Sequence, residues 1–127
     1  MNLLDASSIF NLFQRGKYSI LIAGATIPLA KYEIGNILWK NYKIRNRISK
    51  KEAQEIGNVL FELIDSMEQI VPSPASALSL SLEKGLTFYD SSYLISAIES
   101  GYEFVTDDLK LHKIASSKVT TRKSSDI

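Results

Sequence analysis

The stretch Gly85–Lys110, GLTFYDSSYLISAIESGYEFVTDDLK, decides how the chain is organised. Gly85 and Gly101 are of the residue type that most often ends a helix, and Thr87 is of a type that caps one. Between the glycines, apolar residues recur on one helical face, so we expect a helix there and then a short strand at residues 102–105. The stretch therefore predicts a helix-to-strand unit that ends in polar and acidic residues.

Acidic side chains in and around this unit are expected at one edge of a sheet. Asp107 and Asp108 follow the strand, and Asp90 lies in the first turn of the helix before it. Asp5 follows an earlier apolar run, and Glu33 lies in a helix that starts near the same edge. Because open α/β sheets bind ligands outside the carboxyl ends of their strands, we expect these acids to meet in one crevice.

The remaining segments alternate between strands and helices. We expect strands at residues 2–4, 18–23, 68–71 and 118–120, and helices at 9–16, 29–43, 49–66 and 72–84, with one more helix before the last strand. This alternation predicts an α/β fold with a central, mostly parallel β-sheet flanked by α-helices on both faces. A length of 127 residues suits a single domain, which we place at residues 1–121, with a loose C-terminal tail at 122–127.

Composition limits the chemistry that the acids can perform. The chain has no cysteine and a single histidine, His112, which excludes thiolate zinc sites, cysteine nucleophiles and multi-histidine metal sites within one chain. Any metal must be held mainly by oxygen, which favours Mg²⁺ or Mn²⁺. No run of eighteen apolar residues and no signal-peptide pattern is present, so we expect no membrane segment and a cytoplasmic location.

Each acid also has an ordinary structural explanation. Asp5 is a good helix cap, and Glu33 is of a type that usually faces water. What favours a site is their common edge, since several ionised carboxylates about 4 Å apart repel by roughly 4 kcal/mol per pair and call for a divalent cation. The basic segment Lys40–Lys51 stays open between a solvated turn and a phosphate contact.

The ordered motifs resemble a known family. They are Leu4-Asp5-Ala6-Ser7, Glu33-Ile34-Gly35-Asn36, Tyr89-Asp90 and Val105-Thr106-Asp107-Asp108. Together they resemble the PIN-domain ribonucleases, most closely the small toxins of VapBC-type toxin-antitoxin modules, and the resemblance covers nearly the whole chain.

The resemblance implies an activity and a site. It implies metal-dependent hydrolysis of RNA, with an antitoxin partner and a homodimer. It places Asp5, Glu33, Asp90 and Asp108 around Mg²⁺ or Mn²⁺, with Ser7, Asn36 and Thr106 as polar supports. Asp108 is preferred to its neighbour because the family's Thr-x-Asp pattern falls on Thr106 and Asp108, which leaves Asp107 as an auxiliary.

Two alternatives accompany this interpretation. A haloacid-dehalogenase-like phosphatase would also carry an aspartate after its first strand, but its Asp-x-Asp motif would need an acid where this chain has Ser7. A non-catalytic interaction module could keep the fold and the acids while binding a partner protein. Substitution of Asp90 by Asn separates the last alternative from a nuclease.

Overall fold

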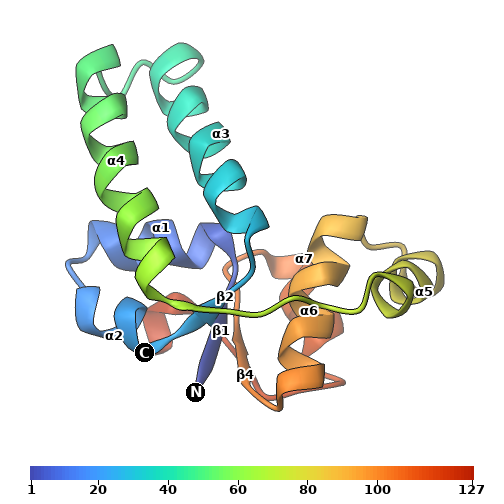
Figure 1. Ribbon diagram of the computed structural model, residues 1–127. Coiled ribbons are helices and arrows are strands. Elements are labelled where there is room, and N and C mark those ends of the chain that lie inside the picture. The colour runs from blue at the N-terminus through green and yellow to red at the C-terminus, as the bar shows by residue number, and fades with distance from the viewer.

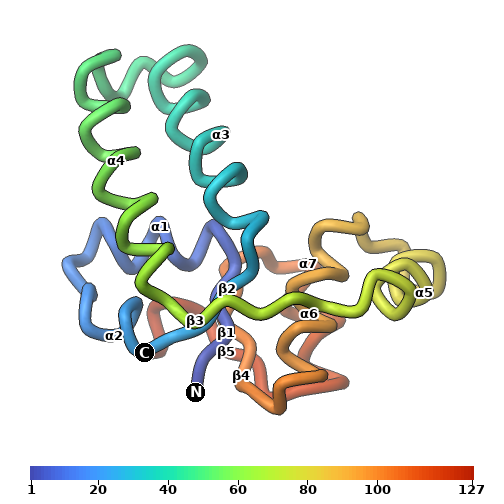
Figure 2. Tube along the Cα trace, viewed as in Figure 1, coloured from blue at the N-terminus to red at the C-terminus, as the bar shows by residue number.

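The computed structural model describes residues 1–127 and contains one five-stranded sheet. All of the strand pairs are parallel, and the strand order is β3-β2-β1-β4-β5. The strands are short: β1 Asn2–Leu4, β2 Ala25–Thr26, β3 Glu68–Gln69, β4 Glu103–Val105 and β5 Thr121–Arg122. Figure 2 shows the labelled strands side by side at the centre of the molecule. The α/β class expected from the alternation is confirmed.

Helices surround this sheet. They are α1 Ala6–Gln14, α2 Tyr18–Ala23, α3 Leu29–Lys43, α4 Lys50–Ser66, α5 Pro74–Lys84, α6 Phe88–Ser100 and α7 Leu109–Ala115, followed by a 3₁₀ turn at Ser124–Asp126. Figure 1 shows α1 and α2 on one side of the strands and α5, α6 and α7 on the other. The antiparallel pair α3 and α4 projects beyond the sheet as a helical hairpin. None of the helices combines the length and the apolar character needed to cross a bilayer.

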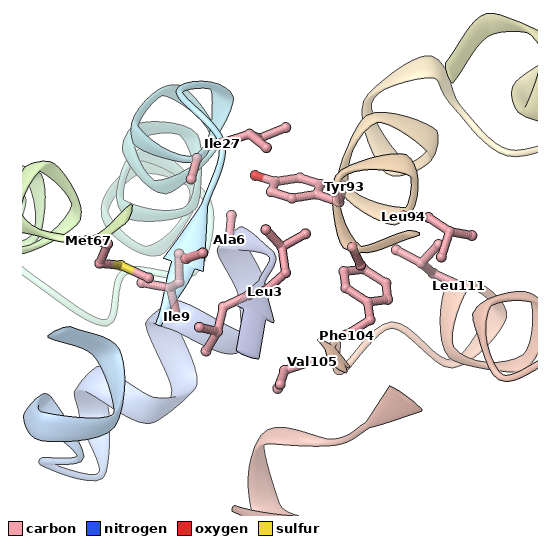
Figure 3. Packing of buried hydrophobic residues seen from close by; sticks show 14 of the residues in the cluster. Leu3, Ala6, Ile9, Ile27, Met67, Tyr93, Leu94, Phe104, Val105 and Leu111 are labelled. Carbon is pink, nitrogen blue, oxygen red and sulfur yellow. The ribbon is translucent and has the colours of Figure 1, made fainter. Parts of the chain in front are cut away.

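Apolar residues hold the sheet and the helices together. Leu3 and Leu4 on β1 are both completely buried, as expected of a central parallel strand that is covered on both faces. Figure 3 shows Ile9 and Met67 packing on one side of Leu3, while Phe104 and Leu94 lie on the other. The sheet therefore lies inside one continuous core of 25 buried apolar residues.

Local sequence signals explain several helix ends. Ser49 and Glu52 form a reciprocal capping box at the start of α4, with hydrogen bonds of 3.0 Å in both directions. Gly85 and Gly101 end α5 and α6 in the left-handed conformation, with φ of 68° and 72°. The expected bounds of α3 and the end of α4 agree with the structure.

The strand expected at residues 18–23 is wrong, because this segment forms the short helix α2. The sheet partner of β1 comes later, at Ala25 and Thr26, whose small side chains are completely buried beside β1. The chain turns toward β1 at Gly24, where a Cβ atom would lie 2.5 Å from Leu4 Cδ1. A six-residue apolar run does not distinguish a strand from a helical turn, and only the small residues after it fit this position.

The end of the chain also differs from the expectation. The last strand lies at Thr121–Arg122 rather than 118–120. Residues 122–127 do not form a loose tail, since Arg122 pairs with β4 and Ser124 is 1% exposed. The amide and hydroxyl of Ser124 both donate to the carboxylate of Asp107, at 2.8 and 2.5 Å. Polar anchoring of this kind leaves no hydrophobic pattern in the sequence.

The strand order determines where a site can form. From β1 the chain adds β2 and then β3 on one side, and later adds β4 and then β5 on the other side. The order therefore reverses between β1 and β4, and a crevice opens at the carboxyl ends of strands on either side of such a point. Asp5 directly follows β1, and Thr106 directly follows β4.

Candidate active site

A pocket of about 370 Å³ lies at this switch point, and we call it the acid pocket. Four carboxylates from separate segments line it: Asp5, Glu33, Asp90 and Asp108. The other lining residues are Ala6, Ser7, Asn36, Ile37, Lys40 and Tyr93. The structure thus brings together the four acids that the sequence motifs single out, and places Ser7 and Asn36 beside them.

Asp5 is held in a single orientation at the end of β1. Its Oδ1 accepts hydrogen bonds from the Ser8 amide at 3.0 Å and the Ser7 hydroxyl at 3.1 Å. Its Oδ2 accepts a 2.5 Å hydrogen bond from the Thr106 hydroxyl. Burial raises the pKa of Asp5 from 3.8 to about 6, although these hydrogen bonds oppose the shift. Asp5 is therefore both the N-cap of α1 and a buried acid of the pocket.

Glu33 extends toward the pocket from the second turn of α3. Its Oε1 accepts a 2.6 Å hydrogen bond from the hydroxyl of Tyr93, which lies on α6. Partial burial raises the pKa of Glu33, and the negative charge of Asp90 raises it further. The Tyr93 hydroxyl stays protonated because burial and the nearby Glu33 carboxylate raise its pKa. This bond couples α3 to α6 across the acid pocket.

Asp90 and Asp108 lie at the starts of two helices. Asp90 is in the first turn of α6, and Asp108 is the N-cap of α7, where it accepts a 2.8 Å hydrogen bond from the Leu111 amide. Partial burial raises the pKa of Asp90, and the charge of Asp108 adds to the effect. Because Asp5 caps α1, three helices direct their N-terminal ends at the pocket, and their dipoles favour negative charge there.

Asp107 has a different role from the auxiliary one expected for it. It does not line the acid pocket, and its carboxylate instead accepts hydrogen bonds from Asn11 on α1 and from Ser124. Partial burial raises the pKa of Asp107, but these hydrogen bonds outweigh the effect and hold the pKa below its usual value. Asp107 therefore fastens the end of the chain to α1.

The donor set of the acid pocket fits a hard cation. Four carboxylates face one cationic side chain, Lys40, and no thiol or imidazole lines the pocket. No three acidic or histidine side chains stand close enough together to form a finished metal-binding cluster. Mg²⁺ does not require one, since it commonly takes one or two carboxylates directly and keeps several waters. Asp5 is the lining acid whose carboxylate is held in a fixed orientation by the most hydrogen bonds.

Two lining residues were missed from the sequence. Lys40 was noted only as part of a basic segment, and Tyr93 was not singled out at all. Helical spacing could have found both: Lys40 lies one turn beyond Asn36 on α3, and Tyr93 lies three residues after Asp90 on α6. This spacing becomes informative only after a neighbouring residue, Asn36 or Asp90, has been assigned to the site.

Comparison with known proteins identifies close relatives of the chain. It is 32% identical over 118 residues to exonuclease VapC9 of Pyrobaculum aerophilum, a match that covers 86% of this chain and 81% of that protein. It is 33% identical over 90 residues to ribonuclease VapC3 of the same organism, covering 68% and 66% of the two chains. No family model matches the chain.

A solved structure shares the whole architecture. The crystal structure of PAE2754 from Pyrobaculum aerophilum superposes on this chain with a TM-score of 0.81 and 29% identity. The match covers 98% of this chain and 91% of the other. The overall fold is therefore similar to that of a solved protein.

Proposed function

Because this chain belongs to the VapC family of PIN-domain proteins, we propose that it is a Mg²⁺- or Mn²⁺-dependent ribonuclease that acts as the toxin of a toxin-antitoxin module. It hydrolyses RNA phosphodiester bonds at the acid pocket. The observation that carries the proposal is the gathering of four carboxylates, from four separate segments, at the switch point of a parallel sheet.

Asp5, Glu33, Asp90 and Asp108 hold the cation in this proposal. A divalent cation bound there supplies an activated water and neutralises the charge that grows on the phosphate. The burial that raises the pKa of Asp5 also makes the empty carboxylate cluster unfavourable once ionised, so a cation has more binding energy to gain. Ser7 and Thr106 act as positioning residues, since both donate to the Asp5 carboxylate.

Lys40 and Asn36 provide the contacts to the substrate. Lys40 is exposed, lines the acid pocket and takes part in no ion pair, so its ammonium group is available to a phosphate oxygen. Asn36 lies one helical turn before Lys40 on the same face of α3. Together they place a donor pair beside the carboxylates, which suits a substrate that is itself an anion.

Partners follow from the same proposal. An antitoxin that presents a basic side chain to the acid pocket would neutralise its carboxylates and exclude the metal. A homodimer is proposed from the resemblance to the family. An RNA substrate and an antitoxin would make the cytoplasm the place of action.

The test is cleavage of defined RNAs by the purified protein. We expect cleavage with Mn²⁺ or Mg²⁺, none with chelator, and at least about a hundredfold loss in Asp90→Asn, since this variant lacks a direct ligand while keeping its side-chain volume. Asp65→Asn, which changes an exposed acid on α4 that does not line the acid pocket, is the matched control and retains cleavage. Equal metal-dependent cleavage by Asp90→Asn and wild type would count against the acid pocket as the site, whereas no cleavage by wild type would favour the non-catalytic interaction module.

A further inference from the structure

A second pocket adjoins the acid pocket, and we call it the arginine pocket. It has a volume of about 360 Å³ and lies between α1 and the hairpin of α3 and α4. Ser7 and Ile37 line both pockets, so the two are direct neighbours. Phe10 and Phe13 of α1 form an aromatic wall of the arginine pocket, and no acidic residue lines this pocket. The volume is within the range of about 300–1,000 Å³ typical of small-ligand pockets.

Asn41 is the residue of the arginine pocket that the fold does not explain. It is only 6% exposed and lines the pocket from the last turn of α3. Its backbone carbonyl accepts a 2.8 Å hydrogen bond from the Arg47 amide, and its side chain lines the pocket without taking part in a hydrogen bond within the chain. Ser91 Oγ is the one fully buried side-chain polar atom without a partner, so the Asn41 carboxamide is still accessible from the pocket and can bond to a ligand there.

Arg45 and Arg47 also line the arginine pocket. Their backbone amides are hydrogen-bonded, but their side chains have no ion-pair partner. The amides of Arg45 and Arg47 are bonded to the carbonyls of Lys40 and Asn41, at 3.0 and 2.8 Å, which fastens the turn after α3 to the helix end. Neither guanidinium takes part in an ion pair. A pair of unpartnered guanidinium groups with no acid nearby attracts phosphate oxygens.

We propose that the arginine pocket binds a nucleotide next to the scissile phosphate of the RNA, with Asn41 reading the edge of its base and Arg45 and Arg47 contacting its phosphates. This inference rests on the proposed ribonuclease function and makes Asn41 a specificity-determining residue. A carboxamide offers one acceptor and two donors, which is the pattern that base edges complement. Unstacked bases of single-stranded RNA are recognised in this way, on aromatic walls and through their edges.

Geometry along α3 supports the same assignment. Glu33, Ile37 and Asn41 follow one another at intervals of one helical turn, and lead from the acid pocket into the arginine pocket. Eight residues of helix span about 12 Å, so the base subsite lies within reach of a nucleotide that flanks the phosphate at the acids. An apolar protein segment could pack against the aromatic side chains of the arginine pocket. It would, however, leave the two guanidinium groups and the Asn41 carboxamide without partners.

The experiment couples a change in the protein to a change in the RNA. Short RNAs with one cleavage site are prepared with a single abasic ribose at each position flanking that site. Cleavage is measured for wild type, for Asn41→Ala, and for Asn58→Ala, a matched control on the exposed side of α4. Circular dichroism and thermal melting establish that each variant folds.

We expect one abasic position to lower kcat/KM of wild type and of Asn58→Ala by about 5- to 150-fold, the range for losing a two-bond base contact. Asn41→Ala should lower kcat/KM on intact RNA by a similar factor and show no further loss at that abasic position. As a second measurement, Arg45→Gln and Arg47→Gln should each reduce the slope of log affinity against log salt by about 0.7, measured by RNA binding to the inactive Asp90→Asn variant.

Each other outcome overturns a distinct claim. If wild type cleaves RNA and Asn41→Ala keeps the full abasic penalty, the base subsite is wrong while the ribonuclease function stands. If the three variants cleave and bind RNA as wild type does but escape inhibition by an antitoxin, the arginine pocket belongs to a protein partner. If wild type cleaves no RNA with Mn²⁺, the proposed function fails and the subsite fails with it.

Discussion

The Thr106 hydroxyl donates a 2.5 Å hydrogen bond to Oδ2 of Asp5 and joins the carboxyl ends of β1 and β4, which are neighbours at the centre of the sheet. Both residues are buried, at 0% and 6% exposure. The same hydroxyl accepts a hydrogen bond from the Asp108 amide at 3.2 Å. The Thr106 hydroxyl therefore fixes the positions of two residues of the acid pocket, Asp5 and Asp108, relative to each other.

Replacing this threonine tests that arrangement. Thr106→Val keeps the shape but leaves a buried carboxylate with one partner fewer, so we expect the free energy of unfolding to fall by about 1–3 kcal/mol at pH 7. The pKa of Asp5 should rise, because the Thr106 bond opposes its upward shift. Urea unfolding measures the first effect. Thr121→Val, at a half-buried position on β5, is the control and should cost less.

Stability should depend on pH through Asp5. Its pKa is about 6 in the folded protein against 3.8 without the fold, so the folded state keeps a proton that the unfolded state loses. Stability of the metal-free protein should therefore be highest below about pH 4 for this group and fall as the pH rises through 6. The loss is about 3 kcal/mol by order of magnitude, and Glu33 and Asp90 act in the same direction.

Metal and proton compete for the same carboxylates. Stabilisation by Mn²⁺ should therefore grow between pH 5 and 7, which thermal melting with and without Mn²⁺ can measure. Asp5→Asn should flatten the metal-free pH profile in this window. A profile that is equally steep in Asp5→Asn would assign the titration to another group.

The adjacent acids Asp107 and Asp108 should behave in opposite ways. Asp107→Asn weakens the hydrogen bonds to Asn11 and Ser124, so we expect a loss of about 1–3 kcal/mol in stability with RNA cleavage retained. Asp108→Asn removes a carboxylate from the acid pocket but keeps a good helix cap, so stability changes little and cleavage is lost. Parallel urea unfolding and cleavage assays distinguish the two, and the reverse pattern would exchange their roles.

Tyr93 should act as a positioning residue. Tyr93→Phe leaves the Glu33 carboxylate without its 2.6 Å hydrogen bond, so we expect the Mn²⁺ concentration for half-maximal cleavage to rise about 10-fold or more. A merely structural role would lower stability without moving that midpoint. Tyr102→Phe, which removes a hydroxyl bonded to the exposed Glu68, is the matched control and should leave the midpoint unchanged.

The C-terminal residues should contribute to stability. Deleting residues 122–127 removes the hydrogen bond from the Thr106 amide to the Arg122 carbonyl and leaves Asp107 without Ser124. We expect the free energy of unfolding to fall by about 2 kcal/mol or more. Lys123→Ala, at an exposed position, should change it by less than about 0.5 kcal/mol. If the truncated chain is as stable as the full-length chain, the original prediction of a loose tail at residues 122–127 is correct.

Long amphipathic helices and their caps could be predicted from sequence. The bounds of α3 and the capping box of α4 are encoded within a few residues, and the structure has them where they are expected. The run at 18–23 could not be assigned, because six apolar residues suit a strand or a helical turn equally and only the packing of Gly24 and Ala25 on β1 decides.

The acid pocket, too, could be predicted from the sequence only in part. Acids placed at strand ends and helix starts could be singled out by position alone, and the structure gathers Asp5, Glu33, Asp90 and Asp108 around one pocket. Whether they hold a metal stays a prediction. The side-chain directions of Asp107 and Asp108 could not be read from sequence, since consecutive residues differ only through long-range partners such as Ser124.

The central position of β1, with β4 beside it, has a consequence for how the protein is made. A ribosome that has released only the first hundred residues has already exposed Asp5, Glu33 and Asp90, but the strand that must lie against β1 has not yet been translated. The nascent chain at this stage therefore contains three of the four acids but lacks β4, the strand that pairs with β1. Cleavage at the acid pocket would therefore require that β4 has also been synthesised and has paired with β1.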